Sequence, residues 1–527
     1  MRPLVIGAGH NGLVAAFYLA RAGLKPIVLE AATEVGGGAV TREIHPGFHV
    51  PTFTHELLLH ERIVRDMQLR SHGLQWLTSS VESLALSESG PPIVVYSDAA
   101  RTAAGLERLS RADAEAWPRF RDTMSRVAAM LAPLLTVPPA RMTRPGIGDI
   151  WELLQAGRRF RGLGRRTARD LLRWLPMPLH DFTHEWFEHD RVRAMVAAAG
   201  LSGAMLAPRS AGGTLALLLR MAHRHLAGGR TLIARGGPGA CTRAMAAAAN
   251  AAGAEIRTST RVEQILTRAG RVTGVLADGH ELASDVVLSA LDPKTTFLSL
   301  VEEQVLPADF QQRIRNYRSA GTLAKINLAL NGLPPFAFRT AADAGGLPDD
   351  ALAGRIHLGD SLDDLERAFD HIKYGEMSEQ PWVDLTIPSV LDPTLAPQGR
   401  HVASMYVHNA PERLRGTEWT NGRSLLLDRA LRALDRVAPG TRSLVAAAQV
   451  LTPADLAVEP GSWGGHIFHG ELAPDQLAGL RPTIDAGTYR MPIDGLYLCA
   501  GGTHPGGFAC GASGRLAARQ TLKDAGR

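Results

Sequence analysis

The fold of this chain is decided by residues 3–30, which read PLVIGAGHNGLVAAFYLARAGLKPIVLE. A short apolar run leads into G-x-G-x-x-G, a helical stretch follows, and a second apolar run ends in the acidic residue Glu30. This order predicts a dinucleotide-binding unit rather than an isolated glycine-rich loop, because a strand, a glycine turn, a helix, a second strand and an acid follow one another.

Each position of this pattern has a physical reason. Gly7 permits a tight turn, Gly9 lets a pyrophosphate approach the backbone, and Gly12 lets the helix pack closely on the strand. Free N–H groups and a partial positive charge at the helix N-terminus attract phosphates. Glu30 is expected to bind the adenosine ribose, and an acid there favours FAD or NAD over NADP. No second unit of this kind follows, so a separate nicotinamide site is not predicted.

Composition bounds the remaining possibilities. The 527 residues carry a formal net charge of +5, with 45% hydrophobic and 21% charged residues, as expected for a globular protein of two or more domains. The basic residues are almost all arginine, and no lysine-rich run or zinc-finger spacing indicates nucleic acid as a partner. Cys241, Cys499 and Cys510 have no metal-ligand spacing, so no metal is predicted, and they favour a reduced, cytoplasmic protein.

Further segments return to the nucleotide-binding pattern. Residues 34–42 hold a second glycine-rich turn, residues 236–292 read as a helix, a small meander and a buried strand, and residues 495–527 as strand, loop and helix. We therefore expect a discontinuous FAD-binding domain made of residues 1–75, 225–300 and 485–527. Residues 76–224 and 301–484 would form a substrate-binding domain with a helical lid. In it, residues 75–225 read mainly as helix, 324–330 and 401–408 as strands, and 340–380 as surface loops and helices.

Residues 151–175 combine many arginines with interleaved aromatic and aliphatic side chains. One interpretation is a basic amphipathic surface that rests on an anionic membrane. The other is a solvated helix face with a buried apolar stripe. No apolar run in the chain is long enough for a membrane-spanning helix.

Four stretches together resemble the phytoene desaturase-like flavoproteins, a group of carotenoid oxidoreductases that lies near the amine oxidases. Within it, the likeness points to the branch of pyridine nucleotide-disulfide oxidoreductase domain-containing protein 2. The stretches are VIGAGHNGLVAA at 5–16, IPS at 387–389, GGHIFHG at 464–470 and THPGG at 503–507. The resemblance implies an α/β fold: a Rossmann-like FAD-binding domain of the glutathione-reductase/amine-oxidase type with an interleaved α+β substrate domain.

The resemblance also implies non-covalent FAD in an extended pose. Phosphate contacts would come from Gly7, Gly9, His10, Asn11 and Gly12, and the adenosine ribose contact from Glu30. The pyrophosphate and ribityl region would be lined by Gly37 and Gly38, the adenine by Val262 with Ala290 nearby, and the ribityl chain and flavin ring by Gly502, Gly507 and Phe508. Many relatives have arginine directly after the glycine pair, where this chain has Gly38 or Ala39, and Arg42 is the nearest candidate to replace it.

A bound flavin predicts hydride transfer at its N5 atom, with a dry apolar slot beside the ring for a polyene, lipid or terpenoid-like substrate. Oxygen or a quinone would be the electron acceptor. The candidate acid–base residues are His466, which has glycine neighbours, and His504, beside the predicted flavin loop. Two alternatives stay open: a flavin-dependent isomerase without net redox change, and a non-catalytic protein that holds FAD and acts through partners.

Overall fold

The structure is a computed structural model that describes residues 2–88, 90–140, 147–340 and 347–527. Residues 3–30 form the predicted unit, with β1 (Leu4–Ile6), α1 (His10–Arg21) and β2 (Ile27–Leu29). β1 lies in the middle of a five-stranded parallel sheet of order β19-β13-β1-β2-β9. Its other strands are β9 (Glu255–Arg257), β13 (Val287–Ser289) and β19 (Leu496–Leu498). The start, middle and end of the chain therefore meet in one sheet.

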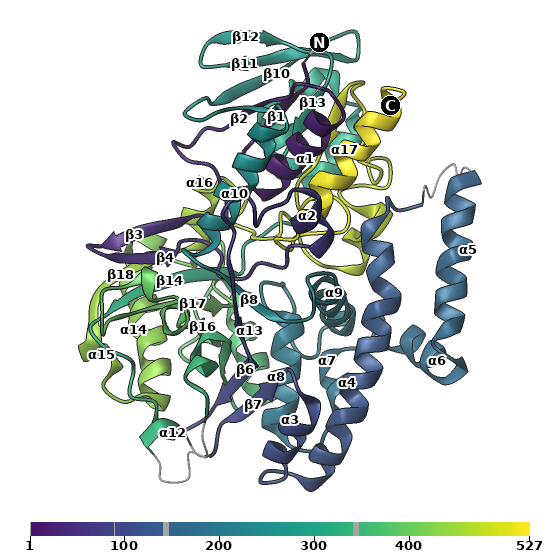
Figure 1. Ribbon diagram of the computed structural model, residues 1–527. Helices are drawn as coiled ribbons and strands as arrows, with labels where there is room; N and C mark the ends of the chain where they lie inside the picture. Colours follow the sequence, from purple (N-terminus) through teal and green to yellow (C-terminus); the bar gives the residue numbers. More distant parts are fainter. Residues whose placement is uncertain (1, 89, 141–146, 341–346) are drawn as a thin grey trace.

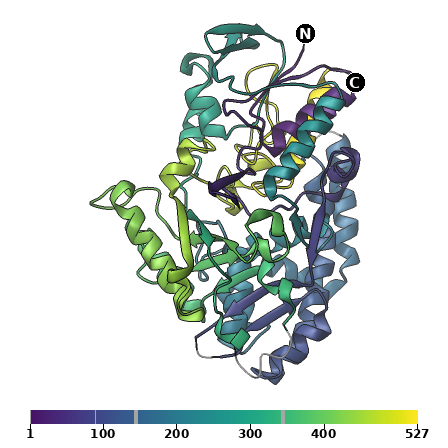
Figure 2. The ribbon, with the colours of Figure 1, turned by 60° about the vertical axis from the view of Figure 1, so that its left-hand side comes forward.

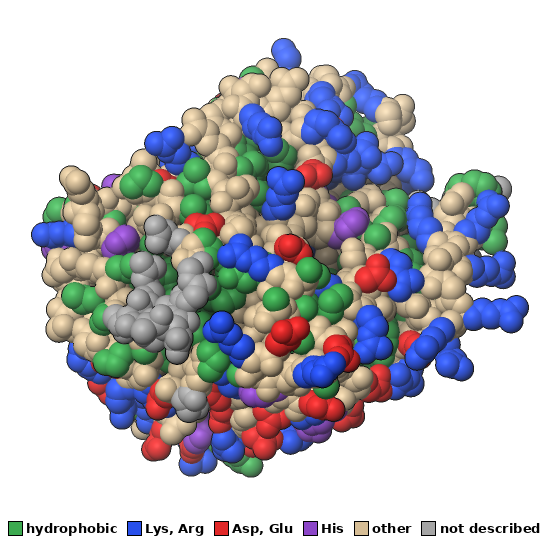
Figure 3. Space-filling view, turned by 60° about the horizontal axis from the view of Figure 1, so that its bottom comes forward, with side chains coloured by type: hydrophobic (Ala, Val, Ile, Leu, Met, Phe, Trp, Pro, Cys, Tyr) green, Lys and Arg blue, Asp and Glu red, His purple; other side chains and the backbone are tan. Residues whose placement is uncertain are grey.

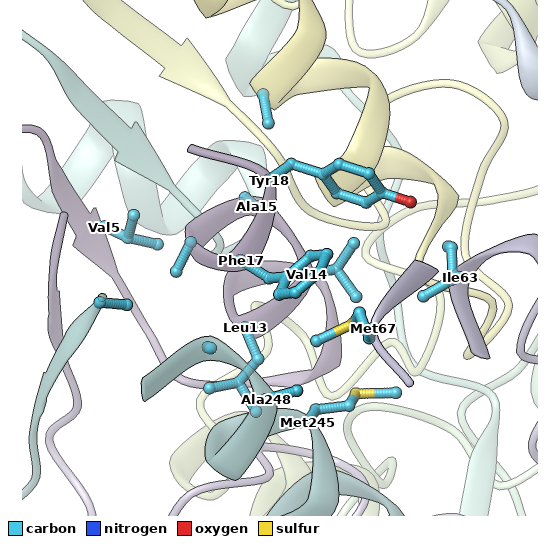
Figure 4. Packing of buried hydrophobic residues seen from close by; sticks show 14 of the residues in the cluster. Val5, Leu13, Val14, Ala15, Phe17, Tyr18, Ile63, Met67, Met245 and Ala248 are labelled. Carbon is cyan, nitrogen blue, oxygen red and sulfur yellow. The ribbon is translucent and has the colours of Figure 1, made fainter. Parts of the chain in front are cut away.

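Both faces of this sheet are covered. On one face α1 packs between α10 (Pro238–Ala251) and α17 (Ala512–Asp524), so the first and last helices lie side by side (Figure 1). Figure 4 shows Leu13 of α1 directed toward Met245, and Val14 and Phe17 toward Met67, in one buried cluster. The other face is covered by the antiparallel sheet of β10 (Val262–Arg268), β11 (Arg271–Ala277) and β12 (His280–Ala283), together with α11 (Ala308–Asn316).

A second sheet has seven strands in the order β18-β14-β17-β16-β15-β6-β7. The strands are β6 (Val81–Leu86), β7 (Ile93–Tyr96), β14 (Leu323–Leu330), β15 (Arg355–Leu358), β16 (Val383–Thr386), β17 (His401–His408) and β18 (Val445–Leu451). The predicted strands at 324–330 and 401–408 are confirmed and pair antiparallel along their whole length. Figures 1 and 2 show α14 (Trp419–Val437) on one side of this sheet and a helical layer on the other.

The helical layer comes from residues 99–226. Its helices are α3 (Ala99–Leu106), α4 (Arg111–Leu131), α5 (Ile147–Gly162), α6 (Arg165–Trp174), α7 (Leu179–His184), α8 (Asp190–Leu201) and α9 (Gly213–Leu226), with the 3-10 helix η1 (Ala132–Thr136) after α4. An aromatic core that includes Trp117, Phe120 and Phe182 holds most of the layer together. Within the described residues, no helix combines the length and apolarity that crossing a membrane requires.

The smaller elements complete the fold. They are α2 (Glu61–Asp66), α12 (Ala337–Thr340), α13 (Leu362–Ile372), α15 (Thr441–Leu444), α16 (Pro453–Val458), β3 (Thr41–His45), β4 (Phe48–Pro51), β5 (Trp76–Ser79) and β8 (Thr231–Ala234).

Residues 75–225 are mainly helical, as predicted, and the strands β5, β6 and β7 precede the first helix of this stretch. One other expectation was wrong in detail. The stretch 340–380 is not confined to the surface, because β15 lies between β16 and β6 with Ile356, His357 and Leu358 buried. The strands β5, β6, β7 and β15 have only four to six residues, which is too short for a period to stand out in the sequence.

Candidate functional site

A cavity of about 540 Å³ begins at the carboxyl ends of β1 and β2 and extends to β17 and α9. Ile6 and Leu29 mark the end at the parallel sheet, and Tyr406 of β17 and Arg220 of α9 mark the opposite end. Ligands of open parallel sheets bind at the carboxyl ends of the strands, where loops and helix N-termini converge. The cavity therefore joins the predicted nucleotide site to the second sheet.

The glycine turn after β1 forms a cradle at the first end. Gly7 has a φ of +93°. Gly9 is the N-cap residue of α1, and no side chain of the described residues accepts a hydrogen bond from the first N–H groups of this helix as a cap. A Cβ atom at Gly12 would lie 2.1 Å from the carbonyl oxygen of Gly7, so only glycine allows this approach of helix and strand. No acidic residue stands in the first turn of α1. The bare N–H groups of α1 can therefore take an anion.

The second glycine turn lies directly against the first. The amide of Gly36 donates to the carbonyl oxygen of Ala8 at 3.0 Å, and Gly9 and Gly36 form an isolated parallel bridge. Gly37 has a φ of +55°, and a Cβ atom there would lie 3.1 Å from Gly9 Cα. At Gly38 no atom lies within 4 Å of such a Cβ atom. Two backbone turns thus wall the same space, as a diphosphate requires.

Glu30 closes this end of the cavity. Its carboxylate accepts hydrogen bonds from the amides of Ala8, at 2.6 Å, and Ala32, at 2.9 Å. These bonds fix the side chain at the end of β2, where it lines the cavity together with Val262 and Ala290. The three residues predicted for the adenosine end are therefore brought together, and a fixed carboxylate still has lone pairs for hydroxyl donors.

Arg42 also lines the cavity, but it is already paired. Its guanidinium binds the carboxylates of Glu34 and Glu459, which raise the pKa of Arg42 although burial opposes them. It also lies over the ring of Phe53, 5.7 Å from the ring centre. Arg42 is thus a fixed cation in the cavity wall, and two carboxylates share it.

Two buried histidines of the wall have unused ring nitrogens. His10 Nε2 and His469 Nδ1 have no hydrogen-bond partner within the described protein, and both residues line the cavity. Burial lowers the pKa of His10 to about 4, with His469 adding to the shift, and burial also lowers the pKa of His469. Both rings are therefore neutral at pH 7, and their unpaired atoms are available to a molecule that fills the cavity.

Arg481 holds the loops that carry this wall. Its side chain is fully buried, and its guanidinium donates to five backbone carbonyls, those of Phe468, Gly470, Glu471, Gln476 and Gly501. Burial lowers the pKa of Arg481. The cation thereby ties the loop at 468–471 to the loop at 501, both of which line the cavity.

The second end of the cavity is mostly apolar. Leu58, Ile467, Phe468 and Phe508 belong to one buried cluster that reaches the cavity surface. The charged groups here are Arg220 and Glu56, which form an ion pair, and Arg220 also donates to the carbonyl oxygen of Ser202 at 3.0 Å. Burial alone would raise the pKa of Glu56, but Arg220 lowers it below its usual value. Both side chains are therefore ionised, and the ion pair has no net charge.

The ring of Phe508 packs against two other side chains. The guanidinium of Arg220 lies 5.0 Å from the centre of its ring, and the ring of His223 lies 4.8 Å from it. His223 Nδ1 in turn shares a 3.1 Å hydrogen bond with His60 Nε2, and one ring nitrogen of each histidine lies within 4.8 Å of Cys510 Sγ in a buried group. The ring of Phe508 is thus held in one position at the cavity wall.

A buried lysine lies just behind the wall. Lys325 Nζ is 3.0 Å from His55 Nδ1 and hydrogen-bonds to Ser404 Oγ. Complete burial lowers the pKa of Lys325 well below its usual value. His55 stacks on Tyr406 with ring centres 4.0 Å apart, and Tyr406 lines the cavity. Lys325 Nζ also lies 4.8 Å from the centre of the Tyr406 ring, so only this one side chain separates the buried amine from the cavity.

The structure places most of the predicted cofactor residues on one surface. The predicted residues that line the cavity are Gly7, Gly9, His10, Asn11, Gly12, Glu30, Gly37, Gly38, Val262, Ala290, Gly507 and Phe508. Gly502 does not line it, because it packs against Pro293, 2.4 Å from where a Cβ atom would stand, and Gly501 takes its place. Individual FAD contacts of these residues stay predictions.

The two candidate catalytic histidines do not line the cavity. His466 Nδ1 accepts a hydrogen bond from the amide of Phe468 at 3.1 Å, and burial lowers its pKa to about 3. His504 Nε2 bonds to the carbonyl oxygen of Leu134 at 3.0 Å, and burial lowers its pKa to about 4. Both rings hold loops together, and the histidine that reaches the cavity from this segment is His469. A catalytic role for His466 or His504 stays a prediction that this geometry does not favour.

Sequence reasoning missed Lys325 and Arg481. A signal existed for Lys325, since the chain has only five lysines and this one interrupts an apolar strand. No comparable signal marks Arg481 among the many arginines, because its importance comes from five carbonyls that only the fold assembles.

Known proteins resemble the chain along most of its length. The family model described as flavin containing amine oxidoreductase matches residues 12–522. Pyridine nucleotide-disulfide oxidoreductase domain-containing protein 2 of Rattus norvegicus is 37% identical over 99% of this chain and 93% of its own. The limonene dehydrogenase of Castellaniella defragrans has a polypeptide that is 25% identical over 99% of this chain and 94% of its own. A putrescine oxidase triple mutant aligns with a TM-score of 0.62 and 17% identity over 100% of this chain and 99% of that structure.

Proposed function

The chain belongs to the flavin-containing amine oxidoreductases, a family of FAD-dependent enzymes, and from this premise we propose that it transfers hydride between a hydrophobic substrate and FAD. The substrate class is a polyene, lipid or terpenoid-like molecule, and oxygen or a quinone is the electron acceptor. The observation that carries the proposal is the apolar end of the cavity, whose ion pair has no net charge.

The residues present fit FAD. The bare N-terminus of α1 and the second glycine turn would hold the diphosphate, and Glu30 would bind the ribose hydroxyls. The unpaired atoms His10 Nε2 and His469 Nδ1 would gain partners from a polar molecule in the cavity. When bound, FAD supplies a two-electron acceptor for the hydride. The protein then has to position the substrate, keep the site dry and fix the electrostatics.

The apolar end of the cavity performs the first two tasks. Leu58, Phe468 and Phe508 present hydrocarbon and aromatic surface, and Arg220 and His223 keep the Phe508 ring in one orientation. Burial of an apolar substrate against this surface is favourable by about 25 cal/mol for each Å² of apolar area removed from water. The surface therefore favours a substrate without charge.

The charges at this end argue against a cationic amine substrate. Glu56 is the carboxylate beside the apolar wall, and Arg220 already neutralises it. An ammonium group here would compete with a fixed guanidinium and leave one cation unpaired in a buried place. The limonene dehydrogenase relative supports an apolar substrate, because its name states a hydrocarbon.

Anaerobic reduction tests the proposal. Purified holoprotein is mixed with monoterpenes, carotenoids, unsaturated lipids and, as the opposing class, polyamines, while the visible absorbance of the flavin is followed. We expect bleaching with a member of the apolar classes and none with polyamines, and reoxidation by oxygen or a quinone. Bleaching by polyamines alone would overturn the proposal, and so would turnover without bleaching that requires pre-reduced flavin.

A further inference from the structure

Residues 147–174 form an arm that stands away from the rest of the molecule. The arm consists of α5 and α6, and Figure 1 shows α5 beside the body of the protein without a neighbouring layer on its outer side. The contacts of α5 with other elements are chiefly with α6. A helix in this position must find partners for its side chains outside the chain or leave them in water.

The arm is attached firmly through α6. Ala168, Leu171 and Trp174 are buried in the aromatic core of the helical layer. Trp174 Nε1 also donates to a carboxylate oxygen of Glu185 at 3.3 Å, and Arg173 binds the same carboxylate. The orientation of the arm relative to the body is therefore set by packing and by a shared acid.

The outer helix exposes large apolar side chains. Ile150, Trp151, Leu153 and Leu154 have 52–59% of their surface exposed, and Leu172 of α6 has 59%. These five are half of the ten exposed large hydrophobic residues found in the described part of the chain. Contiguous apolar surface of this kind marks an interaction site, since scattered exposed residues would not gather on one helix.

The same arm carries a dense positive charge. Arg158, Arg159 and Arg161 end α5, and Arg165, Arg166 and Arg169 follow in α6, all of them exposed. None of these six forms an ion pair with a carboxylate of the described residues, in contrast to Arg173. Figure 3 shows this arm at the right-hand edge, with hydrophobic side chains at its end and basic side chains along it.

We propose that the arm docks on the surface of an anionic lipid bilayer, with its apolar residues in the headgroup region and its arginines on acidic headgroups. The combination of a tryptophan, leucines and flanking arginines is that of interfacial helices. Charge complementarity favours an anionic bilayer as the partner of the arm, because none of the six arginines is neutralised by a carboxylate of the described residues.

The 3-10 helix η1, which precedes the arm in sequence, packs against residues of the apolar end of the cavity. Leu135 of η1 shares a buried cluster with Leu58, Phe468 and Phe508. The carbonyl oxygen of Thr136 accepts a hydrogen bond from Arg515 at 3.3 Å. The inference that apolar substrates enter the cavity from the bilayer rests on the proposed function. The docking of the arm does not depend on that function.

Vesicle flotation tests the docking. Full-length holoprotein is mixed with vesicles of phosphatidylcholine alone, or with about 30% phosphatidylglycerol to give a negative surface potential. We expect binding to the anionic vesicles only, with a loss as ionic strength rises, because surface charges are screened beyond roughly 10 Å at 0.1 M salt. Binding that is equal on both kinds of vesicle, or absent on both, would overturn the proposal.

Matched variants assign the binding to the arm. Arg158→Glu with Arg159→Glu should weaken vesicle binding by about 30-fold or more, at roughly fivefold for each lost cation. Arg268→Glu with Arg271→Glu changes the charge equally on the exposed β10–β11 hairpin and should leave binding within about twofold. Equal effects of both pairs would show that net charge and not the arm is responsible.

A second copy of the chain is the competing occupant of the apolar residues. Trp151→Gln with Leu154→Gln should reduce vesicle binding by about tenfold or more without changing the molar mass in light scattering. Conversion of a dimer to a monomer by this variant, with unchanged vesicle binding, would refute the membrane surface as the occupant. Flavin content measured on every variant separates a docking failure from a failure of the FAD site.

Discussion

Replacing two glycines of the cradle by alanine should separate packing from cofactor binding. In Gly12→Ala the new methyl would lie 2.1 Å from the Gly7 carbonyl oxygen, about 1.3 Å short of ordinary contact at 3.4 Å. Overpacking of this size costs about 1–3 kcal/mol or more. The start of α1 must shift by roughly the same distance, which breaks hydrogen bonds to the diphosphate worth about 1.5–3 kcal/mol each.

Gly9→Ala is the matched comparison. Gly9 has a φ of −68°, which alanine adopts without strain, and the nearest atom to its Cβ position is Gly37 Cα at 3.9 Å. The FAD-free protein should therefore keep its stability within about 0.5 kcal/mol. The methyl nevertheless stands where the backbone must admit a phosphate. Loss of two charged hydrogen bonds corresponds to about 10²- to 10⁴-fold weaker FAD binding.

The assay combines thermal unfolding of both FAD-free variants with FAD titration. We expect Gly12→Ala to lose stability and FAD affinity together, and Gly9→Ala to lose affinity alone. A Gly12→Ala protein as stable as the wild type would refute the close packing of α1 on β1. Wild-type FAD affinity in Gly9→Ala would show that the diphosphate does not lie on this turn.

Three further outcomes follow from the charges around the cavity. Lys325→Met should abolish a pH dependence: between the lowered pKa of the buried amine and about 10.4, the pKa of an unfolded lysine, only the unfolded chain keeps the proton, so wild-type stability rises with pH relative to the variant by up to about 1.4 kcal/mol per pH unit in urea titrations. Arg481→Met, which leaves five carbonyls without their donor, should cost about 3–5 kcal/mol and weaken FAD binding, both seen in a thermal shift with and without FAD. Glu56→Gln leaves Arg220 without its carboxylate partner and should reduce stability by about 1 kcal/mol. The variant should raise KM for an apolar substrate more than it lowers kcat. An unchanged KM would show that the ion pair does not face the substrate.

The nucleotide end could be predicted because its physics is local. A glycine turn, a helix start and an acid at the end of β2 lie within 30 residues, and each is fixed by backbone geometry that only certain residue types allow. The same holds for the long strands β14 and β17, whose length displays a pattern. These features need no distant part of the chain to be recognised.

The substrate end could not be predicted in the same way, because its residues meet only through the fold. Arg220 and Glu56 come from segments far apart in sequence, as do Lys325, His55 and Ser404. His466 and His469 look alike in sequence, and only the left-handed turn at His469, with a φ of 56°, decides which ring reaches the cavity. The exposure of Trp151 and Leu154 on α5 and the burial of Leu171 and Trp174 on α6 also depend on which neighbours the fold supplies.

The most direct measurement is the absorbance of the purified protein before and after denaturation. The account predicts a yellow protein that releases FAD, identified by mass, in a ratio of about one per chain, as expected for a single non-covalent dinucleotide site. A colourless protein that stays colourless after incubation with FAD would contradict the account.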